Sequence, residues 1–356
     1  MIYLDAAAGV APLEAVRTAV RAELAAWRGC ARRRLAAARE RAAAALGVAP
    51  SRLAWTSGAT EANALAVGLA LGAAPAGPRR VVTQPTEHPS LLAPLDALAA
   101  AGAIELELLP VSAQGVVDPA ALAAALERPA ALVSIMAANH ETGVLQPLEA
   151  LAPLCRAAGV PLHVDAAQLP SPRAAIAAGA ELVALSGYKL GGPKGVGLLV
   201  TAPGAGPPGA ARPGPAAAAG LAVALERARD RPPADLLALA VSRDALQAEL
   251  LAAVPGAQVN GGEAPRLPGH LNLSLRGLSG EALVLDLDAR GVVASSGAAC
   301  ATGSGAPSPV LLALGRSRQL AAGSLRLSLP APLAAPERAR VVAAVAEAAA
   351  RLRALA

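Results

Sequence analysis

Lys189 is the residue whose type and position first suggest chemistry. The chain contains 31 Lys and Arg residues, but only two of them, Lys189 and Lys194, are lysines. Arginine stays protonated in proteins, whereas a lysine whose pKa is lowered can act as an amine nucleophile. Lys189 stands between two short apolar runs, 182–185 and 196–200, which are typical of buried strands. We therefore predict that Lys189 forms a Schiff base with a carbonyl cofactor and that Lys194 is a turn residue; a strand-end Lys189 facing water is the alternative.

The segment 56–61, with the sequence TSGATE, offers a place for an anion. It joins a predicted strand to a predicted helix, so the first N–H groups of that helix point at whatever lies beyond the strand. The alternative is an ordinary N-cap, with Thr60 capping the helix.

Three further polar positions follow predicted strands. His88 and His140 each stand just beyond an apolar run, although a lone His is more often structural than functional. Asp165 ends another strand, and its carboxylate can pair with the protonated ring nitrogen of an aromatic cofactor, unless it only caps a helix. With Lys189 and the anion site, these residues meet the needs of pyridoxal phosphate.

Cys300 lies in the segment 295–305, SSGAACATGSG, which contains no bulky residue. Such a segment is expected to be mobile and exposed, which suits a thiolate that travels between sites. A flexible connector with an incidental Cys is the alternative. Cys155, within a predicted helix, is expected to belong to the core.

Composition limits the class of protein. The chain has 356 residues, a net charge of +5 and aromatic residues at only 1%, and its arginines are scattered, so nucleic-acid binding has little support. Three widely spaced cysteines favour a reducing compartment over a disulfide framework. The sequence begins without a signal-peptide pattern and has no purely apolar run long enough to span a membrane. We therefore expect a cytoplasmic protein without contact to a membrane.

Short strands alternate with helices from residue 52 to residue 185, which predicts an α/β domain with a mainly parallel sheet. Ligands bind such sheets beyond the carboxyl ends of the strands. A loop is expected over 201–219, and a long helix over 235–254 leads into a small α+β unit. We predict a large domain over 13–230 and a small one formed by 1–12 and 231–356.

Several motifs together resemble the cysteine desulfurases of the class V aminotransferase family, which are pyridoxal phosphate enzymes of fold type I. The match is carried by their order and approximate spacing. The motifs are TSGATEAN at 56–63, EH at 87–88, ETGVLQP at 141–147, HVDAAQ at 163–168, SGYKLGGPKGVG at 186–197 and SSGAACATGS at 295–304.

The resemblance implies which residues act. Lys189 would carry the cofactor, His88 would stack on its ring, and Cys300 would attack the sulfur of the substrate, leaving alanine and an enzyme persulfide. His140 and Tyr188 stand where the family has Asn and His. Cofactor contacts are implied for Ala59, Thr60 and Ser186 (phosphate), Asp165 (ring nitrogen), Gln168 (phenolic oxygen), His88, His140, Tyr188 and Lys189, and substrate contacts for Arg326 and His140; no metal is implied.

The activity implied is that of an L-cysteine desulfurase, a homodimer that hands sulfur to an acceptor or scaffold protein for iron–sulfur clusters or thio-cofactors. One alternative is a class V lyase or aminotransferase that acts on another amino acid and does not need Cys300. The other is a non-catalytic paralogue that serves as the partner of a desulfurase or scaffold. It is suggested by Pro215 and Ala217, which stand where the family has Thr and Asn. The retained Lys189 favours the enzyme.

Overall fold

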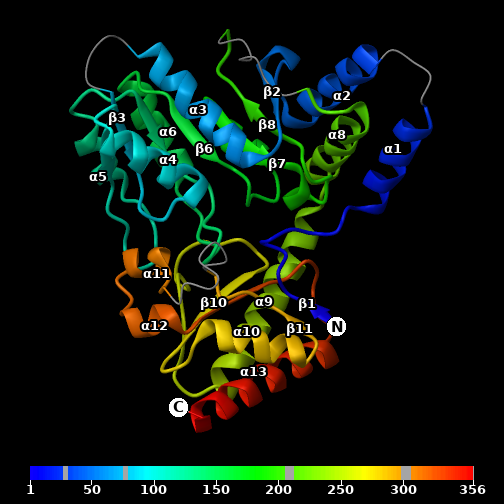
Figure 1. The fold of residues 1–356 in the computed structure, drawn as a ribbon, viewed down its shortest axis with the longest axis vertical. Helices are drawn as coiled ribbons and strands as arrows, with labels where there is room; N and C mark the ends of the chain where they lie inside the picture. Colours follow the sequence, from blue (N-terminus) through cyan, green and yellow to red (C-terminus); the bar gives the residue numbers. More distant parts are fainter. Residues whose placement is uncertain (27–30, 75–78, 205–211, 298–305, 356) are drawn as a thin grey trace.

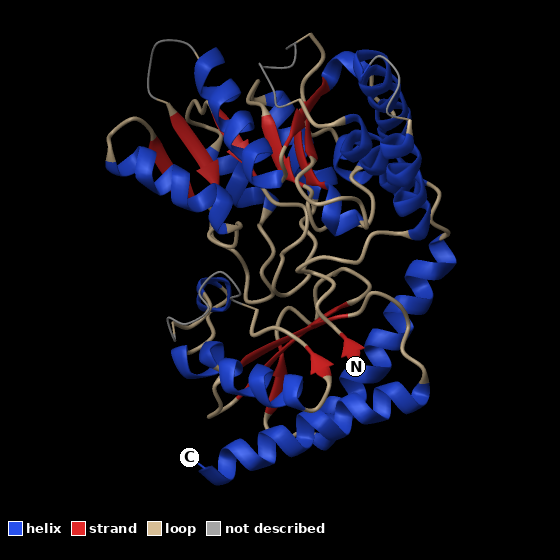
Figure 2. Cartoon of the chain, turned by 45° about the vertical axis from the view of Figure 1, so that its right-hand side comes forward, coloured by secondary structure: helices blue, strands red, loops and turns tan. Residues whose placement is uncertain are grey.

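The computed structural model describes residues 1–26, 31–74, 79–204, 212–297 and 306–355. Its elements form a larger group around a seven-stranded sheet and a smaller group around a three-stranded sheet and a two-stranded pair (Figure 1). Figure 2 shows the sheets of the two groups one above the other, with loops between them. The strands whose ends carry the candidate residues predicted from the sequence lead into those loops.

The large sheet is mainly parallel, as the alternation of strands and helices predicts. Its order is β2-β8-β7-β6-β5-β3-β4. β8 alone runs antiparallel to its neighbours β7 and β2, because residues 187–196 are too few to hold a crossover helix. The strands are β2 (Leu53–Thr56), β3 (Arg80–Thr83), β4 (Glu105–Leu108), β5 (Leu132–Ser134), β6 (Leu162–Asp165), β7 (Leu182–Ser186) and β8 (Gly197–Val200).

Helices cover both faces of this sheet. In β7, Val183 and Leu185 pack into one hydrophobic core, whereas Leu182 and Ala184 pack into another. Side chains alternate along a strand, so a strand buried on both faces appears as a continuous apolar run. The first core contains α2 (Ala31–Leu46), α5 (Pro119–Ala125), α6 (Leu148–Ala157), α7 (Arg173–Ala178) and α8 (Pro215–Arg229); the second contains α3 (Ala59–Ala73) and α4 (Pro89–Ala100), and α1 (Glu14–Ala25) packs on α8.

The smaller group has its own core, which includes residues from the start of the chain. Ile2 and Leu4 pack there with Leu271 and Leu327 from the three-stranded sheet. The division at residues 12 and 230 stays a prediction. Strands β9 (Ala257–Val259), β10 (His270–Leu275) and β12 (Ser324–Ser328) form the sheet, β1 (Ile2–Tyr3) pairs with β11 (Val292–Val293), and the helices are α9 (Pro233–Ala253), α10 (Gly280–Ala289), α11 (Pro309–Ala313), α12 (Arg318–Ala322) and α13 (Ala335–Leu355).

One expectation about local structure is wrong, and the alternative role considered for Thr60 is excluded. The loop expected over 201–219 ends early, because α8 already begins at Pro215 and buries Ala218 against the large sheet. Proline suits the first turn of a helix, where its missing N–H has no partner to lose. Thr60 does not cap a helix, since α3 starts one residue before it and its N-cap is Gly58.

Gly143→Ala tests how tightly the two groups are joined. Gly143 has a φ of +77°, and a Cβ there would lie 2.4 Å from the Cβ of His270 in the small sheet. A left-handed alanine combined with overpacking is expected to lower the free energy of unfolding by about 2 to about 4 kcal/mol, measured by urea denaturation. Gly159→Ala is the matched control, with a φ of +67° and no atom within 4 Å. It should cost about 1 kcal/mol, and equal losses for the two variants would contradict the steric argument.

Candidate active site

A cavity of about 230 Å³ lies at the carboxyl ends of the central strands. It is bordered by the end of β6, by the start of α3, by the start of α4 and by η2 (Gly187–Leu190). Every residue for which the sequence predicts a cofactor contact lines it. These are Ala59, Thr60, His88, His140, Asp165, Gln168, Ser186, Tyr188 and Lys189.

Lys189 is held at the floor of this cavity by the start of the chain. Its Nζ donates a hydrogen bond to the carbonyl oxygen of Ala7 at 2.8 Å. Ala7 is itself fixed, because its N–H donates to the Oγ of Ser328 at the end of β12 at 2.9 Å. The small sheet therefore positions the amine that follows β7 of the large sheet. Lys194 is exposed in the turn before β8, as predicted.

The start of α3 is built to receive an anion. Its N-cap is Gly58, and no side chain among the described residues caps it. The first N–H groups of a helix carry partial positive charge and need acceptors. Thr60 and Ser186, which both carry hydroxyl groups, line the same cavity. This part of the site therefore fits a phosphate group.

Asp165 and His88 are joined by two residues that the sequence analysis did not single out, Asn63 and Ser90. The Nδ2 of Asn63 donates to the Oδ2 of Asp165 at 2.8 Å and to the Oγ of Ser90 at 3.2 Å. Ser90 contacts the Nδ1 of His88 through its Oγ at 2.8 Å and its N–H at 3.0 Å. Asn63 is fully buried on α3. The available signal in the sequence was its place within the TSGATEAN motif.

Asp165 remains able to bind a cationic ring nitrogen. Its Oδ1 accepts from the N–H of Ala167 at 2.9 Å and its Oδ2 from Asn63, but a carboxylate offers about four acceptor positions. Nearby Glu87 is buried, and burial, followed by the charge of Asp165, raises its pKa to about 8. Glu87 is therefore mainly neutral at pH 7.

Two histidines meet at the side of the cavity. The rings of His88 and His140 are edge to face, with centroids 5.0 Å apart. Burial lowers the pKa of His88, and it lowers that of His140 well below the usual value, with the charges of His88 and Arg326 adding to the effect. Both rings are therefore neutral near pH 7.

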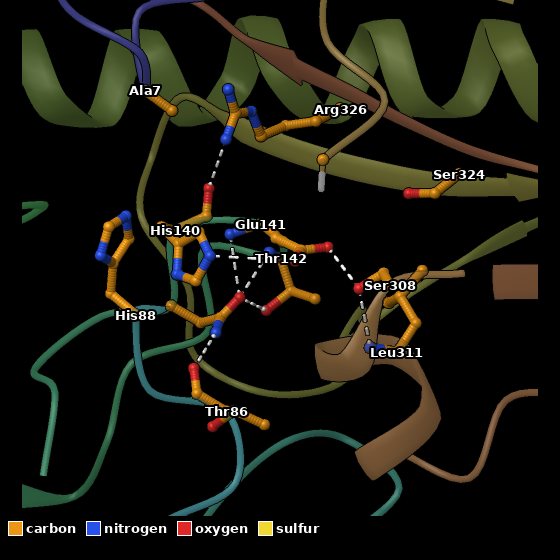
Figure 3. Close-up of polar contacts among 12 residues, drawn as sticks. Ala7, Thr86, His88, His140, Glu141, Thr142, Ser308, Leu311, Ser324 and Arg326 are labelled. Carbon is orange, nitrogen blue, oxygen red and sulfur yellow. Dashed lines mark hydrogen bonds and ion pairs between the residues drawn. The ribbon is translucent and has the colours of Figure 1, made fainter. Parts of the chain in front are cut away.

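Arg326 lies outside this cavity and lines an adjoining one of about 500 Å³, which also borders Lys189, His88 and His140. Its guanidinium donates to the carbonyl oxygen of His140 at 2.9 Å, as Figure 3 shows, and to the Oδ1 of Asp5 at 2.6 Å. Among the described residues, its Nε has no hydrogen-bond partner. A carboxylate in the larger cavity would therefore meet a fixed, positively charged donor.

Cys300 lies outside the described residues. The described chain on either side of it, at Gly297 and at Pro309, lines the larger cavity. Cys155 is buried in the core, as predicted, and burial raises the pKa of its thiol to about 11. Within the described ranges there is no cluster of three metal-binding side chains and no helix long and apolar enough to cross a membrane.

Comparisons with known proteins agree with this architecture. The family model described as Aminotransferase class-V matches residues 2–206. The chain is 38% identical to "Cysteine desulfurase IscS" of Anaeromyxobacter sp. (strain Fw109-5), over 80% of this chain and 74% of that one, and 36% identical to "Cysteine desulfurase NifS" of Azotobacter vinelandii, over 85% and 78%. Among solved structures, a "NIFS-LIKE PROTEIN" superposes with a TM-score of 0.85 at 25% identity, over 99% of this chain and 100% of that one. DndA from Streptomyces lividans gives 0.72 at 31%, over 88% and 96%.

Proposed function

Because the chain belongs to the class V aminotransferase family, we propose that it is a pyridoxal phosphate-dependent cysteine desulfurase, which converts L-cysteine to L-alanine and takes the sulfur as a persulfide on Cys300. Curated relatives that cover most of the chain carry this activity in their names. The observation that carries the proposal is a single cavity that brings Lys189, Asp165, His88 and the uncapped start of α3 together. The same observation favours the enzyme over a non-catalytic paralogue.

The residues present fit the cofactor. Lys189 would attach it, Asp165 would pair with its ring nitrogen, and His88 would lie against its ring. The first turn of α3, with Thr60 and Ser186, would hold the phosphate, and Gln168, Tyr188 and His140 line the remaining wall. When bound, pyridoxal phosphate supplies an electron sink that stabilises negative charge on the substrate carbon next to the amino group.

The chain's own residues would bind L-cysteine and move its protons. Arg326 would hold the carboxylate, and Lys189 and His88, which border the same cavity, would exchange protons with the substrate. The Cys300 thiolate would attack the substrate sulfur, forming an S–S bond as the substrate C–S bond breaks. The electron pair of that bond stays with the carbon skeleton, which leaves as L-alanine after protonation.

The experiment that tests this function compares the visible absorption spectrum of the protein reconstituted with pyridoxal phosphate before and after addition of L-cysteine, with alanine measured in parallel. A cofactor band that cysteine perturbs, with alanine formed, supports a desulfurase. A band that responds only to other amino acids would assign the chain to another class V reaction. Absence of any cofactor band would reject the enzyme.

Arg326→Lys is expected to raise KM for L-cysteine about tenfold to about a hundredfold, with a smaller change in kcat. Lysine keeps the charge but loses the fixed fork of donors that meets a carboxylate, and a hydrogen bond to a charged group contributes about 1.5–3 kcal/mol. Initial rates of alanine formation against cysteine concentration measure the effect. Arg316→Lys is the control, since Arg316 binds Asn260 and Val259 away from the cavity. A fall in kcat with unchanged KM would contradict the role of Arg326.

We further propose a cytoplasmic homodimer that passes its sulfur to an acceptor or scaffold protein. A cleft of about 450 Å³ beside Lys189, lined by Val10, Leu13 and Arg227, offers an edge of the site that a second copy would cover. A persulfide-forming cysteine also needs a compartment that keeps thiols reduced. Light scattering coupled to gel filtration measures the mass, and a value of 34.9 kDa, that of one chain, would contradict the dimer.

A further inference from the structure

Glu141 is a buried carboxyl group to which the function proposed above assigns no task. It lies in the loop after β5, at the wall of the larger cavity, and it is 2% exposed. Its Oε2 accepts a hydrogen bond from the Oγ of Ser308 at 2.6 Å, just before α11 (Figure 3). The carboxyl group therefore joins a loop of the larger group of elements to a residue of the smaller group.

The same carboxyl oxygen lies against Gly297. This glycine has a φ of +88°, and a Cβ built on it would lie 3.0 Å from the Oε2 of Glu141 and 3.2 Å from the Oγ of Ser324. The backbone can come this close because glycine has no side chain and adopts the left-handed conformation without strain. Just before it, Ser295 exchanges two backbone hydrogen bonds with Arg326 on β12, at 2.6 Å and 3.2 Å. Gly297 is therefore anchored to the small sheet and packed on Glu141.

Glu141 is itself held in place by the small sheet. Its carbonyl oxygen accepts a hydrogen bond from the Nδ2 of Asn272 on β10 at 3.3 Å. The Oδ1 of Asn272 accepts from the Nδ2 of Asn260 at 2.7 Å, and Asn260 also donates to the Oγ of Ser274 at 2.9 Å. Buried polar groups that are connected in this way hold one arrangement. Glu141 is therefore a fixed point against which other segments are placed.

Gly297 and Ser308 stand on opposite sides of Cys300 in the sequence. Gly297 comes three residues before it, and Ser308 comes eight residues after it. One carboxyl oxygen of Glu141 therefore meets the described chain on both sides of the cysteine. Gly297 and Glu141 both line the larger cavity, in which the substrate would lie. A reactive group on a short segment meets its target more often when both ends of the segment are held near that target.

We propose that Glu141 is a positioning residue for sulfur transfer, which holds both described ends of the segment that carries Cys300 beside the larger cavity. In the transfer itself, the Cys300 thiolate and the substrate sulfur form the S–S bond as the C–S bond breaks, and Glu141 gains and loses no atom. The inference rests on the proposed function, because it concerns the rate of that step. Glu141 and Ser308 should therefore affect persulfide formation and leave the binding of cofactor and of cysteine unchanged.

Ser308→Ala is expected to slow persulfide formation on Cys300 about tenfold, because one end of the segment loses its bond to Glu141 and the thiol is less often in place. Mass spectrometry of samples quenched during a single turnover measures the rate. The change of the visible spectrum on addition of L-cysteine should reach half-saturation at the native concentration, since Ser308 lines neither cavity. Ser308→Thr, which keeps the hydroxyl group, should restore the rate.

Ser317→Ala is the matched control. Ser308 also caps α11, where the N–H of Leu311 donates to its Oγ at 3.1 Å. Ser317 caps the equally short α12 in the same way, through the N–H of Leu320 at 3.3 Å. Ser317→Ala should therefore lose a helix cap and keep the native rate of persulfide formation. Equal slowing in the two variants would assign the effect to helix capping and overturn the proposal.

Two substitutions of Glu141 separate the hydrogen bond from the charge. Glu141→Gln keeps an oxygen that accepts from Ser308 and should slow persulfide formation by less than about threefold. Glu141→Leu has a similar size but no acceptor, so it should match Ser308→Ala, and the double variant should be no slower than either single variant. If the losses of the two single variants multiplied in the double variant, Glu141 would not act through Ser308, and the proposal would fail.

Amide hydrogen exchange in the cofactor-free protein tests the contact without any turnover. Glu141→Leu should raise the exchange rates at 295–297 and at 308–313, whereas Ser308→Ala should raise them at 308–313. Thermal unfolding of each variant confirms that the fold is retained. Unchanged exchange at both ends in Glu141→Leu would overturn the proposal.

The two measurements can fail separately. If the native protein reconstituted with cofactor formed no persulfide, the proposed function would fail, and hydrogen exchange would still decide whether Glu141 holds the two ends. If exchange rose as expected while Ser308→Ala formed persulfide at the native rate, the contact would be structural only, and the positioning role of Glu141 would be rejected.

Discussion

Lys189→Ala is expected to abolish the formation of alanine from L-cysteine, with a loss in kcat of about a thousandfold or more. The substitution removes both the amine that would attach the cofactor and a proton-transfer group, and general acid–base catalysis alone typically contributes about 10²–10⁴-fold. The Nζ of Lys189 now donates to the carbonyl oxygen of Ala7, so the variant also loses one contact between the start of the chain and η2. Alanine production and cofactor retention after borohydride reduction measure the result.

Lys194→Ala is the matched control. It removes the only other lysine, which is exposed in the turn that precedes β8 and does not line the cavity. It should keep full activity and full covalent retention of the cofactor. If Lys189→Ala retained the cofactor covalently, or Lys194→Ala lost it, the cofactor would be attached to a residue other than Lys189. Either result would reject the proposed site.

Cys300→Ala is expected to stop the transfer of sulfur while leaving cofactor binding intact. Without a thiolate to accept the substrate sulfur, the C–S bond has no nucleophile to cleave it, and the rate of alanine formation should fall about a hundredfold or more. Because Cys300 lies outside the described residues, this expectation rests on the sequence and on the family. Mass spectrometry of the protein after one turnover measures the persulfide, and the visible spectrum measures the cofactor.

Cys155→Ala separates this effect from the loss of any thiol. Cys155 is buried in the core, where burial raises the pKa of its thiol to about 11, so it supplies almost no thiolate at neutral pH. The variant should form the persulfide on Cys300 normally and lose only stability.

If Cys300→Ala kept full turnover of an amino acid other than cysteine, the chain would be a class V lyase or aminotransferase.

The residues of the site could be predicted from the sequence because local patterns place them. A short apolar run followed by a polar residue marks the end of a buried strand, and the carboxyl ends of parallel strands meet at one edge of a sheet. Asp165 at the end of β6 and Lys189 just after β7 are brought to one cavity in this way. The anion site at the start of α3 could be predicted in the same way, because a strand that leads into a helix presents the first N–H groups of that helix at the same edge of the sheet.

Contacts between distant segments were decided only by the tertiary structure. The Asp5–Arg326 pair and the hydrogen bond from Lys189 to Ala7 join the start of the chain to its middle and its end. The hydrogen bond from Ser308 to Glu141 joins the two groups of elements. The bridge of Asn63 and Ser90 between Asp165 and His88 is of the same kind. Polar side chains have many potential partners, and the packing of the two sheets selects among them.

Local sequence patterns are enough to predict the type of fold and the chemical groups of the site, because the ends of strands and the starts of helices can be recognised from the spacing of apolar residues and from capping residues. The tertiary structure decided how those groups are held. In the folded chain, β8 runs antiparallel to its neighbours, and α8 begins within the segment expected to be a loop. The buried carboxyl group of Glu141 lies beside His140, which stands where the family has Asn. The physical reason is that hydrogen bonds, burial and pKa values depend on which segments meet, and that is set by the packing of the whole chain.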